Sequence, residues 1–320
     1  MSVFSHVARP AIMAASRSHG LRHAAERLPV TRKVVHRFVP GETVGDAMES
    51  VGVLRDTDRY VSIDYLGEDV TDADAAQQTV TAYLGLLDAL GSRGEHRGSP
   101  APLEVSLKLS ALGQALPRDG EKIALENAHA ICAKAQEIGA WVTVDAEDHT
   151  TTDSTLSIVR ELRTDFDWLG TVLQAYLKRT EGDCAEFAAA GARIRLCKGA
   201  YDEPASVAYR GRDEVTDAYL RCLAVLMRGA GYPMVASHDP AIVAAVPALV
   251  GETGRGVGDF EYQMLYGIRD DEQVRLVGEG NHLRVYVPFG TQWYGYFVRR
   301  LAERPANLAF FLRALTHRSA

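Results

Sequence analysis

Short runs of β-forming residues alternate with longer amphipathic stretches along most of the chain. Eight such runs recur at fairly even intervals, at residues 59–65, 104–110, 141–147, 171–177, 192–198, 233–238, 259–265 and 283–288. Between the runs, apolar residues return every three or four positions, which is typical of helices that bury one face. The clearest such segments are residues 72–90, 121–138, 152–162 and 213–227. Eight strands joined by helical crossovers predict an α/β fold, a closed (βα)8 barrel of the TIM type.

Helical periodicity also marks the beginning of the chain. The apolar positions of this segment fall on one stripe, made by Val3, Phe4, Val7, Ala8 and Ala11. Pro40 and Gly41 end the segment. We therefore divide the chain into an N-terminal helical arm, residues 1–50, packed outside a barrel formed by residues 51–320.

Polar residues gather where the predicted strands end. In this fold the active site lies at the carboxyl ends of the strands. The residues in question are Asp64, Glu68, Lys108, Ser110, Asp145, Glu147, Gln174, Tyr176, Arg195, Lys198, His238, Gln263 and Tyr286. Charged groups are costly to bury at one mouth unless they pair or bind a charged ligand. We expect this mouth to be the functional site.

Lys108 stands in the otherwise apolar alternation of the second run, which turns its ammonium toward the mouth. Asp145, at the end of the third run, is its expected partner. Structural ion pairs are common in barrel mouths, so this pair alone is compatible with a structural or a functional role.

Arg299 and Arg300 are adjacent on a helix predicted after Gly290, about one turn after Tyr296. Neighbouring helical side chains point about 100° apart, so both guanidinium groups can flank one small anion. Guanidinium groups match a carboxylate bidentately. An isolated arginine pair is more often a solvated helix face, so its surroundings must decide between the two interpretations.

Lys198, Gly199 and Ala200 close the fifth run and form a candidate phosphate cradle with His238; a simple strand-ending turn is the alternative. The glycines at 254, 256 and 258 precede a strand, so they do not form a dinucleotide fingerprint. Histidines and acids show no convincing metal-ligand spacing, and we predict no metal site. No G-x-S-x-G motif points to a nucleophilic serine.

Composition narrows the class of protein. With 47% hydrophobic and 24% charged residues, the 320-residue chain has the profile of a globular protein with a sizeable core. A formal charge of −7 argues against nucleic acid as a partner. No run approaches the roughly 18 apolar residues of a membrane span. The four cysteines show no C-x-x-C spacing, which favours a reducing, cytoplasmic location.

The charge is unevenly distributed. The first forty residues carry seven basic side chains against the single acid Glu26, a formal +6. Such an arm is a candidate for peripheral contact with an anionic membrane surface, here the inner face of the membrane. A solvated helix packed on the barrel explains it equally well, and both interpretations stay open.

Five segments, in this order on the predicted barrel, resemble the proline dehydrogenase family. They are SLKLSALG from Ser106, VDAED from Val144, RIRLCKGAY from Arg193, ASHD from Ala236 and RVYVPFGTQWYGYFVRRLAE from Arg284. The resemblance runs from about Arg59 to the end of the chain and is to the monofunctional bacterial type. It implies a distorted (βα)8 barrel that holds FAD noncovalently, with the eighth helix over the mouth.

The resemblance also implies the reaction, the first step of proline catabolism toward glutamate. L-Proline would be oxidised to pyrroline-5-carboxylate by hydride transfer to flavin N5, and the electrons would pass to a quinone. A separate pyrroline-5-carboxylate dehydrogenase would take the product.

Roles for individual residues follow from the same resemblance. Lys108, Arg299 and Arg300 are implied as the clamp for the proline carboxylate, with Asp145 holding Lys108. Glu68 is implied as the gate that pairs with the first arginine. The implied walls of the substrate pocket are Tyr201, Leu265, Tyr286 and Tyr296. The implied FAD-binding residues are Gln174, Arg195, Cys197, Lys198, Gly199, Ala200, Ser237 and His238.

Two other kinds of protein remain as alternatives. One is a flavin barrel of the methylenetetrahydrofolate reductase type, which shares the architecture and a charged mouth. The other is a non-catalytic scaffold at a membrane surface, in which the mouth charges are structural salt bridges. The arginine pair one turn after Tyr296 favours a small amino acid as substrate.

Overall fold

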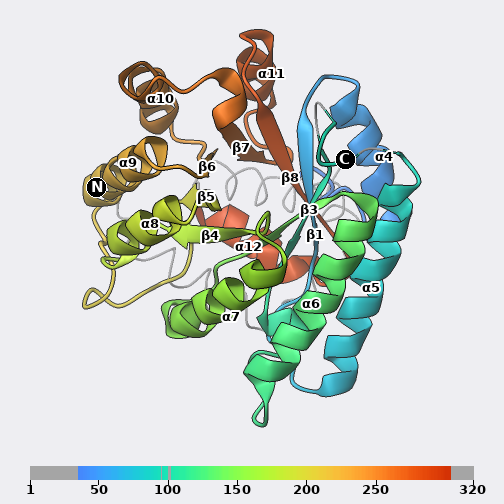
Figure 1. Ribbon diagram of the computed structural model, residues 1–320. Helices are drawn as coiled ribbons and strands as arrows, with labels where there is room; N and C mark the ends of the chain where they lie inside the picture. The colour runs from blue at the N-terminus through green and yellow to red at the C-terminus, as the bar shows by residue number, and fades with distance from the viewer. Residues whose placement is uncertain (1–34, 95, 100–101, 304–320) are drawn as a thin grey trace, which may run out of the picture.

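Eight parallel strands close into a barrel in the computed structural model, which describes residues 35–94, 96–99 and 102–303 (Figure 1). Along the chain they follow the order β1 to β8, and β8 pairs with β1. The strands are β1 Tyr60–Tyr65, β2 Glu104–Leu107, β3 Trp141–Val144, β4 Gly170–Gln174, β5 Arg193–Cys197, β6 Tyr232–Ala236, β7 Glu261–Leu265 and β8 Leu283–Phe289. Each predicted run coincides with one strand to within a few residues, so the predicted barrel is confirmed.

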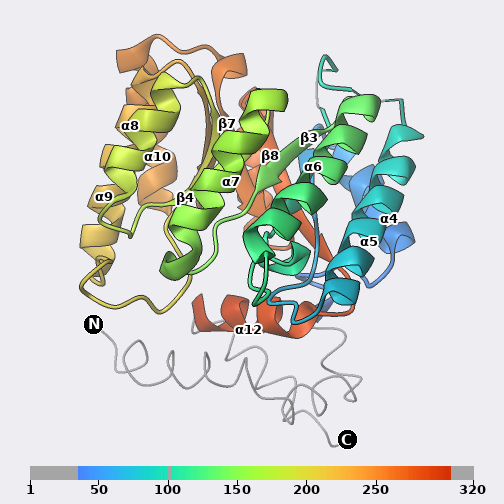
Figure 2. The same cartoon turned by 60° about the horizontal axis from the view of Figure 1, so that its bottom comes forward.

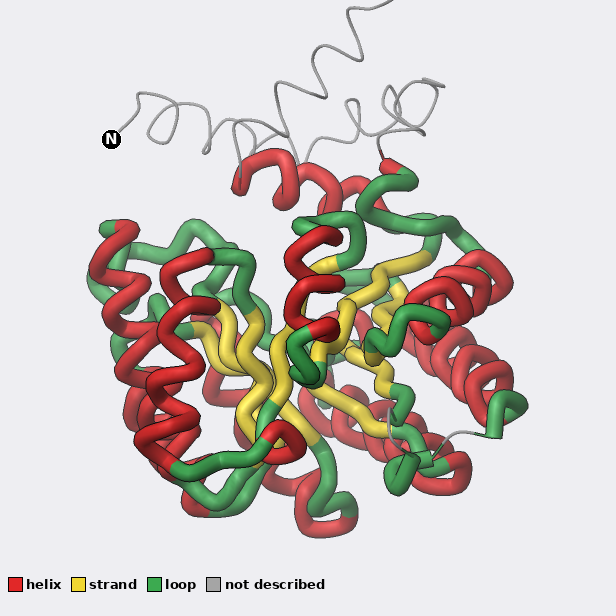
Figure 3. Tube along the Cα trace, turned by 90° about the horizontal axis from the view of Figure 1, so that it is seen from above, coloured by secondary structure: helices red, strands yellow, loops and turns green. Residues whose placement is uncertain are grey.

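Helices surround the strands, as Figure 3 shows with the strands running between helices on both sides. They are α4 Val44–Arg55, α5 Ala73–Gly91, α6 Gly120–Ile138, α7 Thr152–Asp165, α8 Thr180–Ala189, α9 Arg212–Arg228, α10 Pro240–Thr253, α11 Asp270–Gly278 and α12 Trp293–Glu303. The four segments singled out by periodicity correspond to α5, α6, α7 and α9. On α5, for example, Val80, Tyr83, Leu87 and Leu90 are buried three or four positions apart.

The main core lies between the strands and this outer layer. Val61, Ile63, Val105, Val142 and Val144 are fully buried there. β-Branched side chains suit this position because they pack well on a pleated surface. Closure of the sheet pairs both edges of each of these eight strands.

The regular pattern changes after β8. In a regular barrel the last helix would cover the outside of β8 and β1, but here α4, which precedes β1, packs against both strands. α12 instead lies across one end of the barrel (Figure 2). This exchange is the distortion expected of the fold, and it brings the arginine-bearing helix to the mouth.

The predicted N-terminal arm lies mostly outside the described residues, including its apolar stripe and six of its seven basic side chains. Within the described part, Pro40 and Gly41 do precede a helix. Thr43 caps α4, since its Oγ1 accepts from the Asp46 backbone at 3.2 Å and the Asp46 carboxylate accepts from the Thr43 backbone at 2.9 Å. α4 spans the predicted boundary at residue 50, and the division into arm and barrel stays a prediction.

Candidate active site

Charged and polar side chains fill the interior of the barrel. Arg195 on β5 donates to the hydroxyl of Ser62 on β1, at 3.1 Å, although the two strands lie opposite each other in the closed order. Contacts of this kind cross the lumen, so the side chains that make them face inward. These inward-facing side chains therefore form a polar layer next to the charged residues of the mouth.

Lys108 follows β2 directly and is buried. Its Nζ donates to Asp64 Oδ2 at 2.8 Å and to Tyr286 Oη at 3.4 Å, while Asp145 Oδ2 lies 3.6 Å away. The prediction that Asp145 is the partner of Lys108 was thus incomplete, because the direct hydrogen bond goes to Asp64 on the neighbouring strand β1. Asp145 is the second carboxylate beside the ammonium.

The charge on Lys108 is stabilised by its surroundings. Burial lowers the pKa of an ammonium, but Asp64, Asp145 and Glu68 outweigh burial and raise the pKa of Lys108 above its usual range. Lys108 therefore stays protonated and can attract an anion at the mouth.

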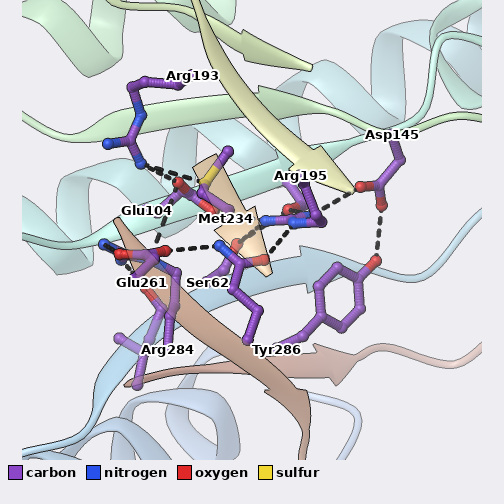
Figure 4. Close-up of polar contacts among 12 residues, drawn as sticks. Ser62, Glu104, Asp145, Arg193, Arg195, Met234, Glu261, Arg284 and Tyr286 are labelled. Carbon is purple, nitrogen blue, oxygen red and sulfur yellow. Dashed lines mark hydrogen bonds and ion pairs between the residues drawn. The ribbon is translucent and has the colours of Figure 1, made fainter. Parts of the chain in front are cut away.

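Asp145, just after β3, is hydrogen-bonded to two other side chains. Its Oδ1 accepts from Arg195 Nη1 at 2.8 Å, and its Oδ2 accepts from Tyr286 Oη at 2.8 Å (Figure 4). Burial raises the pKa of Asp145, and the charges of Lys108 and Arg195 oppose that rise. These contacts fix the positions of Arg195 and Tyr286 relative to each other.

Arg195 is held on every side. Its five N–H groups all have acceptors within the chain, as the network in Figure 4 shows in part. The acceptors are Gln263 Oε1 at 2.6 Å, Ser106 Oγ at 2.8 Å, Asp145 Oδ1 at 2.8 Å, Ser62 Oγ at 3.1 Å and Glu104 Oε1 at 2.6 Å. An arginine with all donors engaged is a rigid positive charge.

A second charged layer lies nearer the amino ends of the strands. Glu104 accepts from Arg193 Nη2 at 2.9 Å, and Arg284 donates to Glu261 Oε1 at 2.7 Å (Figure 4). All four side chains are buried. Sequence reasoning missed this layer, although a signal was present: polar residues occupy every second position of several strands, as in Glu104, Ser106 and Lys108.

α12 carries the arginine pair over the mouth. Arg299 forms a bidentate ion pair with Glu68 beyond β1; its Nη1 donates to Oε2 at 2.9 Å and its Nη2 to Oε1. Burial would raise the pKa of Glu68, but Arg299 and Lys108 lower it overall. Arg300 is buried, with its guanidinium 5.1 Å from the centroid of the Tyr296 ring. The structure thus pairs the predicted gate residue with the first arginine.

Packing holds α12 in this place. Trp293, Phe297 and Val298 form an apolar cluster with Val35 and Phe38 from the segment before α4. The Phe38 and Phe297 ring centroids lie 6.1 Å apart. The helix is therefore fixed by apolar contacts on one side and by the ion pair of Glu68 on the other.

The remaining predicted pocket walls come from three parts of the barrel: Tyr201 follows β5, Leu265 ends β7 and Tyr286 lies within β8. All three are half-buried. The Leu265 backbone N–H donates to His238 Nε2 at 2.9 Å, which joins the ends of β6 and β7. Burial raises the pKa of Tyr201 above its usual range, so its hydroxyl stays neutral.

The predicted cofactor residues follow the consecutive strands β4, β5 and β6. Gln174 Nε2 donates to the Glu147 carbonyl oxygen at 2.7 Å. Lys198 Nζ donates to Thr216 Oγ1 at 2.8 Å and to Asp239 Oδ2 at 2.7 Å. These residues form a row along consecutive strand ends, and Arg195 joins that row to the cluster around Lys108 through Asp145.

Three smaller cofactor candidates complete that row. Cys197 contacts the Leu173 carbonyl oxygen at 3.6 Å, and burial raises the pKa of its thiol to about 12. Ser237 Oγ accepts from the Asp239 backbone N–H at 3.1 Å. Ala200 is half-buried.

Gly199 allows the tight turn that follows β5. Its φ is +107°, and a Cβ built there would lie 2.3 Å from the Tyr176 ring. Glycine is thus required at this strand end. An amide and an ammonium beside such a turn, together with the fixed positive charge of Arg195 earlier on the same strand, suit a group that combines a polar ring with anionic phosphates. The donor set therefore fits FAD.

Glu147 is a further buried acid at the mouth. It accepts from the backbone N–H of Ser110 at 3.0 Å and also from the Ser110 hydroxyl. Burial raises its pKa to about 7. Within the described ranges, no group of three or more histidines, cysteines or acids is arranged to hold a metal ion. No helix in the same ranges is both long and apolar enough to cross a bilayer.

A parallel barrel with clustered charges at the carboxyl ends of its strands defines a (βα)8-barrel enzyme. The family model for proline dehydrogenase matches residues 47–313. The chain therefore belongs to the proline dehydrogenase family of oxidoreductases, which confirms the resemblance noted in its sequence.

Individual relatives agree with this assignment. Proline dehydrogenase 1 of Bacillus subtilis is 40% identical over 286 residues, covering 89% of this chain and 91% of the relative. Proline dehydrogenase of Deinococcus radiodurans is 39% identical over 284 residues, covering 88% and 90%.

Among solved structures, proline utilization A from Bdellovibrio bacteriovorus matches with a TM-score of 0.78 at 24% sequence identity. The match covers 91% of this chain and 34% of that longer protein. At this level of identity the likeness shows the shared fold.

Proposed function

We propose that this chain is an FAD-dependent enzyme that oxidises L-proline to pyrroline-5-carboxylate. The observation that carries the proposal is the set of cations at the mouth: Lys108 from the barrel and Arg299 and Arg300 from α12. Three cations from opposite sides suit the carboxylate of a small amino acid. The membership of the chain in the proline dehydrogenase family supports proline as that amino acid.

The clamp orients the substrate. Lys108 is held charged by its acidic neighbours and contributes a point charge, whereas the two guanidinium groups contribute paired N–H donors. Glu68 occupies Arg299 when no substrate is clamped, so it acts as a gate that competes with the incoming carboxylate. Holding the carboxylate fixes the ring of proline relative to the barrel, and such positioning contributes much of the rate in flavin enzymes.

Tyr201, Leu265, Tyr286 and Tyr296 would form the apolar walls around the substrate ring. Tyr286 is held by its hydrogen bond to Asp145, so its ring cannot easily move aside. We infer that this bulk favours proline over hydroxyproline. α12 covers the substrate and excludes water.

The row along β4 to β6 would hold FAD. Arg195 and Gln174 face the flavin ring in this proposal, while Lys198, Gly199 and His238 take the ribityl and pyrophosphate part, with Cys197, Ala200 and Ser237 beside them. When bound, FAD supplies at N5 the acceptor for a hydride from the ring carbon next to the proline nitrogen. Arg195, with its fixed positive charge, favours a flavin that gains negative charge.

Electrons and product then leave the enzyme. We infer a quinone as the electron acceptor and a separate pyrroline-5-carboxylate dehydrogenase as the next enzyme. A cytoplasmic protein with peripheral contact at the membrane suits a quinone. The basic arm that would make this contact lies outside the described residues, apart from Arg37.

Anaerobic addition of L-proline to the FAD-loaded protein tests the reaction and the clamp together. We expect proline to bleach the flavin absorbance of the wild type. Arg299→Lys and Arg300→Lys should bleach at least tenfold more slowly at equal proline, because lysine cannot donate bidentately. Arg221→Lys is the matched control, since Arg221 pairs with Glu181 on the surface.

Three outcomes would overturn parts of this proposal. A protein that takes up no flavin during reconstitution with FAD is not a flavoenzyme. Bleaching by a nicotinamide cofactor instead of proline would favour the folate-reductase alternative. Normal bleaching in both arginine variants would remove the clamp assignment.

A further inference from the structure

We propose that Asp64 is the positioning residue of the substrate clamp: it holds the Lys108 ammonium in place and keeps it charged for the substrate carboxylate. This inference rests on the proposed function. It concerns a residue on β1 that the sequence placed at the mouth but gave no role.

The distances distinguish the two acids beside Lys108. Asp64 Oδ2 accepts a direct hydrogen bond from Lys108 Nζ at 2.8 Å, whereas Asp145 Oδ2 lies 3.6 Å away. Both oxygens of Asp145 already accept hydrogen bonds, one from Arg195 and one from Tyr286. Asp145 therefore orients Arg195 and Tyr286, and Asp64 orients Lys108.

Asp64 is itself fixed by the barrel wall. It is fully buried, and Tyr83 on α5 is 1% exposed. The Tyr83 hydroxyl lies 2.5 Å from the Ser106 carbonyl oxygen and 3.3 Å from Asp64 Oδ1, so it shares its proton between these acceptors. The two oxygens of Asp64 thus have different partners, since Oδ1 contacts the outer helix and Oδ2 holds the lysine.

This arrangement leaves one N–H of Lys108 for a ligand. An ammonium has three donors. One is directed to Asp64 Oδ2 and a second to Tyr286 Oη. Among the described residues, no third group accepts a hydrogen bond from Lys108. A substrate carboxylate supplies that acceptor.

Removing the charge of Asp64 leaves the buried Lys108 ammonium with fewer negative charges to stabilise it. The charged and titratable groups that act on this region include Asp64, Asp145, Glu68, Glu147, Arg195, Arg299, Arg300, Tyr83, Tyr201 and Tyr286. Of the acids, Asp64 makes the largest contribution that favours the charged lysine. Without it, burial pulls the Lys108 pKa downward, and the ammonium loses its proton at a lower pH.

The test is Asp64→Asn, which keeps the shape of the side chain and removes its charge. The probe is cyclopentanecarboxylate, a ring carboxylate without an amine, titrated into the FAD-loaded protein and followed by the change in flavin absorbance between pH 6 and pH 10. We expect wild-type affinity to stay flat across this range. The variant should bind at least tenfold more weakly at neutral pH and weaken further as pH rises.

Further variants distinguish the loss of the Asp64 charge from a change in the packing around it. Asp64→Glu keeps the charge in a shifted position and should restore the flat pH profile without restoring full affinity. Asp88→Asn is the matched surface control, since Asp88 pairs with Lys134 outside the barrel, and it should bind like the wild type. If Asp64→Asn fails to fold, Tyr83→Phe takes its place; it keeps the charge of Asp64 but removes a contact that positions it, so it should weaken binding two- to threefold with a flat pH profile.

Each result has one meaning. If the wild type neither bleaches with proline nor binds the probe, the proposed function has failed. If the wild type does both, and Asp64→Asn binds as tightly as it or weakens equally at every pH, the role of Asp64 is refuted while the proposed function stands. When Tyr83→Phe is used instead, wild-type affinity at all pH values refutes that role.

Discussion

Glu104 is the centre of the buried charge network, and replacing it by glutamine should destabilise the protein strongly. Its Oε1 accepts from Arg195 at 2.6 Å and its Oε2 from Arg193 at 2.9 Å, with Arg284 4.0 Å away. Glutamine keeps the volume but removes the negative charge. Three buried guanidinium groups would then lose a shared counter-ion.

The structure allows the size of the effect to be worked out in two ways. Burial would raise the pKa of Glu104, but Arg284, Arg195 and Arg193 outweigh it and lower the pKa from 4.5 to about 2. A shift of this size corresponds to about 3 kcal/mol of stability at neutral pH. Removing one partner of a buried ion pair typically costs about 3–5 kcal/mol, which agrees.

Thermal unfolding followed by circular dichroism measures the change. At roughly 2 °C per kcal/mol for a chain of this size, Glu104→Gln should lower Tm by roughly 6–10 °C at pH 7. Glu252→Gln is the control, because Glu252 pairs with Arg228 on the surface at 3.5 Å, and we expect at most about 0.5 kcal/mol there.

The stability contributed by Glu104 should depend on pH, which gives a second test. Because the folded-state pKa of Glu104 lies below its ordinary value, its stabilising effect is complete above about pH 4.5 and is lost as pH falls toward 2. The difference in Tm between wild type and variant should therefore narrow on acidification below pH 4.5. A loss below about 1 kcal/mol at pH 7, or a difference that does not change with acid, would refute this reasoning.

Three more predictions concern the mouth. Gly199→Ala should weaken FAD binding about tenfold, because it forces a Cβ into the Tyr176 ring at positive φ. The ratio of flavin to protein absorbance measures this loss. Gly182→Ala is the control and should keep a normal ratio, because there is open space for its Cβ. Glu68→Ala should lower the KM for proline by about tenfold while flavin content stays constant, because Glu68 no longer competes with the substrate carboxylate for Arg299; an unchanged or higher KM would contradict a gate at this position. The rate of flavin reduction by proline should rise with pH in stopped-flow measurements, because hydride leaves most readily when the amine nitrogen is neutral; a flat profile would contradict that step.

Much of the fold could be predicted because its signals are local. Each strand is a short run of β-forming residues, and each of the helices α5, α6, α7 and α9 carries apolar residues at helical spacing. Parallel strands in a barrel all point the same way, so polar residues at their carboxyl ends had to meet at one mouth. Lys108, Asp145 and Arg195 do meet there.

The inner charged layer could not be predicted from local sequence patterns. Glu104, Arg193, Glu261 and Arg284 lie at the beginnings of strands, and nothing in their immediate neighbourhood shows that they face the lumen. Their facing depends on the stagger of the closed sheet. The alternation of polar residues at every second position would have identified them once closure was assumed.

The sequence by itself determined the alternation of strands and helices, the order of the barrel, the family and the set of polar residues at the mouth. Only the tertiary structure decided which acid holds Lys108 and which charged side chains pair in the inner layer. Asp64 and Lys108 are 44 positions apart in the chain, and Glu104 and Arg193 are 89 positions apart. Their meeting depends on barrel closure and, for Lys108, on one acceptor lying at 2.8 Å and its competitor at 3.6 Å, and no pattern of neighbouring residues encodes either.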